Sequence, residues 1–368
     1  MSKLLSPNAC VYERYFSDTF LLLFRNSRRF EIYLLTLHPL FYTGMRRLWV
    51  RRGAGAAAAL AGCAGGQALY LKARYDELTG EGGSLPAAKG PLSGIAHWRR
   101  KQQQQQQQFG FALPHRASSS RVVVVSSAAE PASPARLRKN ILFIGDSLVT
   151  GVGCSQEAAA GPALPRAVAQ FVSERMRVDV SWAAIGETGG DVRELREHLM
   201  PQLCAEVGRV RAAGQQVDAV VVLCGLNDYK KAISDGKMPW AFRRELRKLI
   251  TEVKVAAGVQ CTVVLPALPV HRAPVFEGVW PLQPLLATAS AVWDEQKAVL
   301  GQTLRSVAFV RNADADEWWS AQRYWAVDGI HPNDEGYRVW GEHIGGAILP
   351  LLRQPRGALV SAISGGAA

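Results

Sequence analysis

The sequence lacks the residue patterns of several functional classes. It has six cysteines, but no pair is spaced as C-x-x-C and none lies near a histidine at metal-ligand spacing. These spacings are the usual signatures of zinc and redox sites, so we interpret the cysteines as buried thiols. The chain also has no N-x-S/T sequon, and nothing in it indicates N-linked glycosylation.

The second part of the chain has no excess of positive charge. Residues 1–139 hold 20 of the 43 Lys and Arg but only 7 of the 31 Asp and Glu. The remaining residues are therefore nearly neutral, whereas nucleic-acid binding needs clustered Lys and Arg on the binding domain itself. The sequence predicts no nucleic-acid partner for this part.

Residues 1–72 form a basic leader with a candidate membrane helix. Residues 53–71 are 19 consecutive residues without charge, which is long enough to cross a bilayer, although Ala and Gly make them only weakly apolar. A membrane anchor, a cleaved leader and an Ala-rich helix are the interpretations left open. We expect a membrane-associated or organellar protein, with the compartment unspecified.

Composition divides the rest of the chain into three segments. Residues 73–138 are rich in Gly, Pro, Ser and Gln and contain a run of glutamines, which predicts a low-complexity linker with little packed structure. Residues 139–353 form the predicted domain. Residues 354–368 are expected to be a flexible tail.

Short apolar runs alternate with longer segments within the predicted domain. The runs have strand length and are mostly apolar without strict alternation, as in a sheet buried on both faces: 140–145, 178–185, 217–225, 260–268 and 307–313. The segments expected to be helices are 162–177, 191–213, 239–257, 283–305 and 334–352. Five β–α units predict a three-layer α/β/α fold around a five-stranded parallel sheet.

Polar residues follow the predicted strands, at the sheet edge where α/β proteins place their sites. A serine hydroxyl needs a base to remove its proton, and the base needs a partner that orients it. We predict Ser147 as the nucleophile, His331 as general base and then acid, and Asp328 as the orienting carboxylate. The Ser147 N–H, a glycine N–H within residues 186–191 and the Asn227 amide are candidate oxyanion donors.

Each of these residues also has a structural interpretation when it is taken singly. Ser147 could cap a helix, Asn227 could form a turn, and His331 could take part in a capping interaction beside Asp328. Their occurrence together, in this order and each after a predicted strand, favours catalysis.

Three further features are not assigned a catalytic role. Asp146 and Asp228 are expected to stabilise loops through hydrogen bonds with the backbone. Residues 269–282 combine aromatic and apolar side chains, and they either line an acyl pocket or cover the sheet.

Over about residues 140–352 the chain resembles the SGNH, or GDSL, hydrolases, including bacterial membrane-tethered esterases of that family. The motifs are G-D-S at 145–147, a glycine in the second loop, G-L-N-D at 225–228 and D-G-I-H at 328–331. G-x-S-x-G is absent, which disfavours the α/β-hydrolase fold with its nucleophile elbow.

The resemblance implies a flavodoxin-like fold and a serine ester hydrolase that needs neither a metal nor an organic cofactor. It implies that Ser147, Asp328 and His331 form the triad and that Gly189 and Asn227 serve as oxyanion donors. Gly186 and Gly190 are alternatives to Gly189, which best matches the T-G-x-T-x-x-x-L pattern of bacterial relatives.

The sequence therefore predicts a membrane-associated hydrolase whose partner is a small-molecule acyl ester. Lipid or fatty-acyl esters are the leading substrates, cleaved through an acyl-enzyme. A deacetylase of O-acetylated carbohydrates is the alternative enzyme, and a catalytically silent membrane-tethered binding module is the alternative from another class.

Overall fold

The structure is a computed structural model of the whole chain. It describes residues 59, 62–71, 73, 85–98, 138–236, 238–268, 272–312 and 321–353. Two compact units comprise residues 1–66 and 67–368, and the described residues of the first unit, 59 and 62–66, are helical. Within the described ranges no helix is long and apolar enough to cross a membrane. The candidate membrane helix at 53–71 lies partly outside these ranges, and the predicted tail at 354–368 lies wholly outside them. The predicted boundaries of the segments remain predictions.

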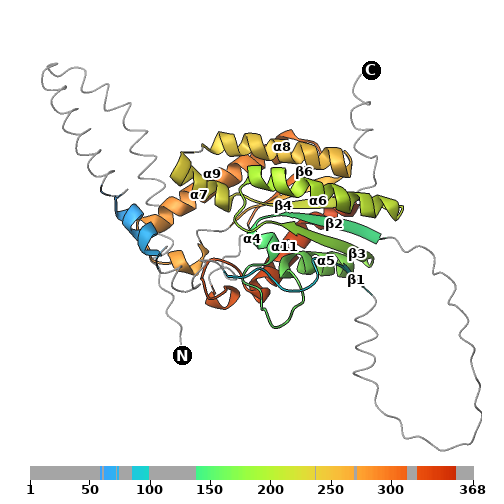
Figure 1. Cartoon of the computed structure of the whole chain (residues 1–368), viewed down its shortest axis with the longest axis horizontal. Coiled ribbons are helices and arrows are strands. Elements are labelled where there is room, and N and C mark those ends of the chain that lie inside the picture. The colour runs from blue at the N-terminus through green and yellow to red at the C-terminus, as the bar shows by residue number, and fades with distance from the viewer. Residues whose placement is uncertain are drawn as a thin grey trace, which may run out of the picture. The chain divides into compact units, whose positions relative to one another are not determined.

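The second unit is built on a six-stranded sheet with the order β1-β3-β2-β4-β5-β6 (Figure 1). All neighbours from β3 to β6 in this order are paired in parallel. The parallel strands are β2 (Arg138–Gly145), β3 (Asp179–Gly186), β4 (Ala219–Leu223), β5 (Thr262–Pro266) and β6 (Val307–Val310). The predicted α/β class with a mostly parallel sheet is confirmed.

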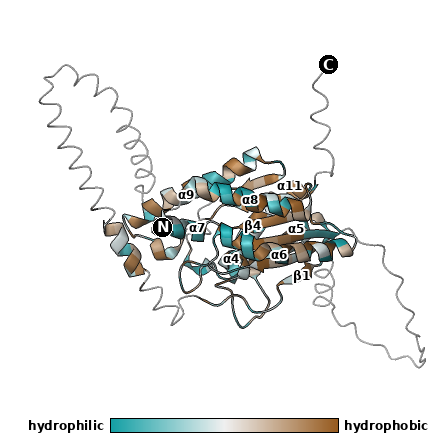
Figure 2. Cartoon of the chain, turned by 45° about the horizontal axis from the view of Figure 1, so that its top comes forward, coloured by the Kyte–Doolittle hydropathy of each residue, from teal (hydrophilic) through white to brown (hydrophobic). Residues whose placement is uncertain are grey.

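Helices cover both faces of the sheet. Phe143 and Val221 pack towards α5 (Ala163–Met176) and α11 (Asp334–Arg353). Their neighbours Ile144 and Val222 pack on the other face, towards the helices α6 (Val192–Ala212), α8 (Pro239–Ala257) and α9 (Leu282–Thr303). Because successive strand residues point to opposite faces, both faces need apolar side chains, and the central strands are largely brown in Figure 2.

The sixth strand, β1 (Ser93–Ala96), lies in the segment expected to be a linker. It pairs antiparallel with β3 and covers that edge of the sheet. A Cβ added at Gly94 would lie 3.1 Å from the indole Nε1 of Trp182, so a residue without a side chain fits closely there. The five predicted parallel strands are all present, and β1 is an additional antiparallel strand that was not predicted in this segment. S-G-I-A is too short to show a strand pattern, and it pairs with the open edge of β3.

Two short helices follow strands and were not predicted. These are α4 (Ser147–Thr150) after β2 and α7 (Leu226–Asp235) after β4. Two single 3₁₀ turns, η2 (Pro274–Phe276) and η3 (Gln322–Tyr324), lie in the connections before α9 and α11. Both helices begin at the carboxyl ends of central strands, where the candidate site residues lie.

The buried-thiol interpretation of the cysteines holds for only some of them. Cys154, Cys224 and Cys261 are buried, whereas Cys63 and Cys204 are exposed. Cys204 belongs to α6, on the face turned away from the sheet, and the position of a residue on a helix face decides its exposure. Cys10 lies outside the described residues.

Candidate active site

Ser147 is the first residue of α4, directly after β2. Asp146 caps this helix, because its side chain accepts a hydrogen bond of 3.1 Å from the Leu148 N–H. The turn is tightly packed: a Cβ added at Gly145 would lie 2.2 Å from the Leu223 carbonyl oxygen. The G-D-S sequence therefore places a serine at a helix start on the carboxyl edge of the sheet.

The three predicted triad residues form one series of hydrogen bonds. Ser147 Oγ lies 3.0 Å from His331 Nε2, and His331 Nδ1 lies 2.6 Å from Asp328 Oδ2. The other carboxylate oxygen of Asp328 accepts the N–H groups of Ile330 and His331, both at 3.0 Å. The three residues are 6%, 8% and 1% exposed, in the order Ser147, His331 and Asp328, so water does not compete strongly for these bonds.

Two buried aspartates near Ser147 have opposite pKa shifts. Burial alone would raise the pKa of Asp328, but the hydrogen bond and charge of His331, with two backbone N–H groups, hold it below its ordinary value. Burial raises the pKa of Asp146 to about 6, and the Leu148 N–H and the charge of His331 offset this only in part. Asp328 is therefore ionised at neutral pH, and it can stabilise a protonated His331.

Asn227 lies in the first turn of α7, beside the residue that caps α4. Its side-chain Nδ2 donates to the Gly190 carbonyl oxygen at 3.1 Å and to Asp146 Oδ2 at 3.4 Å. The preceding Gly225 has φ 125°, a conformation that favours glycine. The G-x-N-D sequence thus turns the chain sharply and brings an amide next to the Ser147 turn.

The loop after β3 holds the three candidate glycines in different surroundings. A Cβ at Gly186 would lie 2.7 Å from Thr150 Cγ2, and one at Gly190 would lie 2.9 Å from Leu195 Cδ2. Gly189 has φ 87° and no atom within 4 Å of an added Cβ, so it faces open space. The Gly190 N–H already donates to the Glu187 carbonyl oxygen at 3.3 Å. These differences favour Gly189 as the glycine that is free to contact a substrate.

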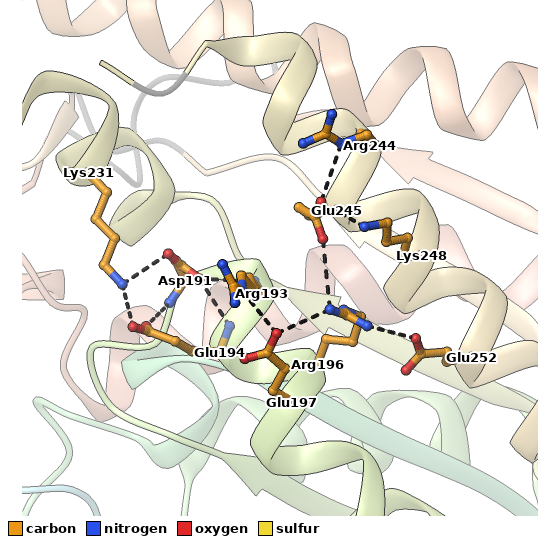
Figure 3. A network of polar contacts seen from close by, with 10 residues as sticks. All are labelled: Asp191, Arg193, Glu194, Arg196, Glu197, Lys231, Arg244, Glu245, Lys248 and Glu252. Atoms are coloured by element: carbon orange, nitrogen blue, oxygen red, sulfur yellow. Dashed lines mark hydrogen bonds and ion pairs between the residues drawn. The ribbon is translucent and has the colours of Figure 1, made fainter. Parts of the chain in front are cut away.

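A polar network holds this loop against α7 (Figure 3). Asp191 and Glu194 form a capping box at the start of α6. Lys231 on α7 contacts both, at 2.9 Å and 2.6 Å, and the Asp228 carboxylate accepts the Val192 N–H at 3.1 and 3.2 Å. The network continues from α6 to α8 through ion pairs of Arg196 with Glu245 and Glu252. The segments that carry Gly189 and Asn227 are thereby fixed to each other.

Most of the polar residues at this edge of the sheet were predicted from the sequence. Asp146 and Asp228 accept backbone N–H groups, as predicted. Lys231 was missed, because a lysine on a helix gives no sequence signal of its partner; the D-V-R-E capping box beside it could have been recognised. Among the described residues, no three His, Cys, Asp or Glu side chains come together as metal ligands would.

A parallel sheet lies between helix layers, and a buried serine, histidine and aspartate are joined by hydrogen bonds at its carboxyl edge. This is the arrangement of a serine hydrolase with a catalytic triad. The chain belongs to the GDSL-like Lipase/Acylhydrolase family, whose model matches residues 143–339. It is a GDSL-type carboxylic ester hydrolase.

Solved structures resemble this chain at low identity. A carbohydrate esterase family 2 enzyme with a carbohydrate-binding domain from Corynascus thermopiles (Myceliophthora fergusii) is 19% identical, with 61% of this chain and 69% of that one covered and a TM-score of 0.43. A lipase/acylhydrolase from Enterococcus faecalis is 20% identical, with 58% and 96% covered and a TM-score of 0.40. An acetylxylan esterase from Geobacillus stearothermophilus is 17% identical, with 59% and 95% covered and a TM-score of 0.38. No curated protein matches the chain.

Proposed function

We propose that this enzyme hydrolyses lipid or fatty-acyl esters through an acyl-enzyme on Ser147. The Ser147 oxygen attacks the acyl carbon while His331 Nε2 takes the hydroxyl proton. The bond to the alcohol oxygen then breaks, and His331 returns the proton to the leaving alcohol. Water repeats the sequence on the acyl-enzyme and releases the carboxylic acid. The hydrogen-bonded series of 3.0 and 2.6 Å from Ser147 through His331 to Asp328 carries this assignment.

The oxyanion of each tetrahedral intermediate is bound by the N–H groups of Ser147 and Gly189 and by the Asn227 amide. In the free enzyme Asn227 Nδ2 donates to Asp146 over 3.4 Å, which is long for an N–H···O bond and therefore weak. A bond to a full negative charge on the substrate oxygen is shorter and stronger. The Asn227 amide can thus gain interaction energy in the transition state that it lacks in the ground state, which is what accelerates a reaction.

The triad is tested with the full chain on p-nitrophenyl esters from acetate to palmitate. Wild type should turn over, and Ser147→Ala and His331→Ala should lower kcat by about 10⁶-fold. His343→Ala is the matched control, because this histidine bonds the Arg311 carbonyl oxygen far from the site. A fluorophosphonate should label wild type and not Ser147→Ala.

Three outcomes count against the proposed function. If wild type is no faster than Ser147→Ala on every ester and is not labelled, the chain is a silent binding module. If acetate is the only ester hydrolysed, the enzyme is a deacetylase and the lipid assignment is wrong. If His331→Ala retains full activity, another group acts as the base.

We also propose that residues 53–71 hold the enzyme at a membrane, close to lipid esters. The support is the uncharged run of 19 residues after an arginine cluster. Replacing Ala57 and Ala61 by Arg adds two charges, and each raises the free energy of membrane insertion by about 3 kcal/mol at the centre of a span. Wild type should sediment with membranes in high salt, and the double variant should stay in the supernatant. Wild type in the supernatant would contradict the anchor.

A further inference from the structure

A cleft of about 480 Å³ lies beside the triad loop. One side is formed by Asp328 and Gly329, and the backbone of this loop is tied to the 3₁₀ turn η2 by a hydrogen bond from the Val275 N–H to the Gly329 carbonyl oxygen, 3.3 Å long. The volume is within the usual range of about 300–1,000 Å³ for small-molecule sites. The cleft therefore adjoins the loop that carries Asp328, the residue that bonds His331.

Three of the residues that line the cleft lie outside the region that matches the family. Gln67, Tyr70 and Leu71, all in a helical segment, line it together with residues of the loop before α9. That loop belongs to residues 269–282, where an acyl pocket was one of two interpretations of the sequence. The family match begins at residue 143, so Gln67, Tyr70 and Leu71 lie outside the matched region.

Gln67 fixes the wall to the domain through both ends of its amide. Its Nε2 donates to the Trp280 carbonyl oxygen at 2.5 Å, and its Oε1 accepts the Leu282 N–H at 3.2 Å. Leu282 is the first residue of α9, and Pro281 before it supplies no side-chain cap. Helix starts leave N–H groups without partners in the helix, so Gln67 acts as the cap of α9 from a distant part of the chain.

The lining selects for an uncharged hydrocarbon group. Six of the lining side chains are apolar or aromatic: Tyr70, Leu71, Pro274, Val275, Val279 and Val327. The charged residues among the described lining are Glu277 and Asp328, both acidic. A phosphate or carboxylate would meet like charge and no cationic partner, whereas a hydrocarbon chain would bury apolar surface.

We propose that this cleft binds the hydrocarbon chain of an ester held at Ser147, and that Gln67, Tyr70 and Leu71 form the wall that selects long chains. This proposal rests on the proposed ester hydrolysis and adds to it the residues that determine chain-length specificity. It assigns residues 67–71 to the substrate site, so these residues cannot at the same time lie inside a bilayer, and the membrane span proposed over residues 53–71 is a competing assignment for them.

The test compares kcat/KM for p-nitrophenyl palmitate and acetate in full-chain variants. Tyr70→Ala removes part of the wall, and Gln67→Leu keeps a side chain of similar size but removes both hydrogen bonds. Each should lower the palmitate-to-acetate ratio about tenfold or more, since small changes in apolar pocket contacts discriminate by about 10- to 200-fold. Leu69→Ala is the matched control, because Leu69 is 71% exposed and does not line the cleft.

Fluorophosphonate labelling of Ser147 measures the active fraction of every variant, so that misfolding does not enter the ratio. An unchanged ratio in both Tyr70→Ala and Gln67→Leu would overturn the cleft assignment while ester hydrolysis itself stood. An equal fall in the Leu69→Ala ratio would also overturn it, because the effect would not belong to the lining. If wild type hydrolyses no ester and is not labelled, the proposed function is wrong and the cleft assignment fails with it.

Discussion

Replacing Asp146 by asparagine should change how the stability of the protein depends on pH. Asp146 is fully buried beside Ser147, and burial raises its pKa from 3.8 to about 6. A carboxyl group whose pKa is raised on folding binds its proton more tightly in the folded state. Asp146 therefore contributes its full stabilisation of the folded state below its pKa in the unfolded chain, near 4, and this contribution is lost as the pH rises through about 6. Asparagine cannot ionise, so the variant lacks this loss.

The size of the effect follows from the two pKa values. They differ by about 2 units, and each unit corresponds to about 1.4 kcal/mol, which gives about 3 kcal/mol. The asparagine oxygen can still accept the Leu148 N–H, but its amide cannot accept the long bond from Asn227. That loss is about 1 kcal/mol and does not depend on pH. The change in relative stability between pH 4 and pH 8 is therefore the quantity to measure.

Urea unfolding of the full chain, followed by tryptophan fluorescence at several pH values, makes this measurement. The stability of Asp146→Asn relative to wild type should rise by about 3 kcal/mol from pH 4 to pH 8. Glu335→Gln is a control of opposite sign, because the bond to Arg338 lowers the pKa of Glu335. If the stability of Asp146→Asn relative to wild type stays constant from pH 4 to pH 8, burial does not raise the pKa of Asp146, and the reasoning is refuted.

Two further substitutions test the oxyanion donor and the core. Asn227→Ala should lower kcat by about 10²–10³-fold with a smaller change in KM; steady-state kinetics on a short ester checks this, and an unchanged kcat would remove Asn227 from the oxyanion site. Lys297 is buried and donates to Pro266 O at 2.9 Å and to Asp294 at 3.2 Å. Lys297→Met should cost about 3–5 kcal/mol of stability in urea unfolding, and adding Asp294→Leu should recover much of it; a double variant no more stable than the single one would contradict this.

The parallel sheet and the triad could be predicted because their signals are local. Each parallel strand contains a short, mostly apolar run, and the strands β2 and β3 end at a glycine. Asp328 and His331 are three residues apart, so one turn brings them together whatever the rest of the chain does. Ser147 joins them because the carboxyl ends of parallel strands share one edge.

Contacts between distant segments could not be predicted. Strand β1 has no apolar alternation, and its position depends on distant segments: it pairs with the edge of β3, and its Ala96 carbonyl oxygen accepts a hydrogen bond from Ser173 Oγ on α5. Gln67 gives no local signal that it caps α9, since its partners lie more than two hundred residues away. The surroundings of Gly186, Gly189 and Gly190 could not be predicted either, because Thr150 and Leu195 pack against the first and the third from other segments.

Three loops of the site each contain an aspartate whose side chain accepts backbone N–H groups from residues two or three positions further along the chain. Asp146 accepts from Leu148, Asp191 from Arg193 and Glu194, and Asp328 from Ile330 and His331. Such turns form from neighbouring residues alone, so each loop has its shape before the loops meet. The catalytic groups are thereby placed by short sequences at the strand ends, while the cleft wall at Gln67 depends on a tertiary contact. Chain-length specificity can then change through residues 67–71 without altering the triad.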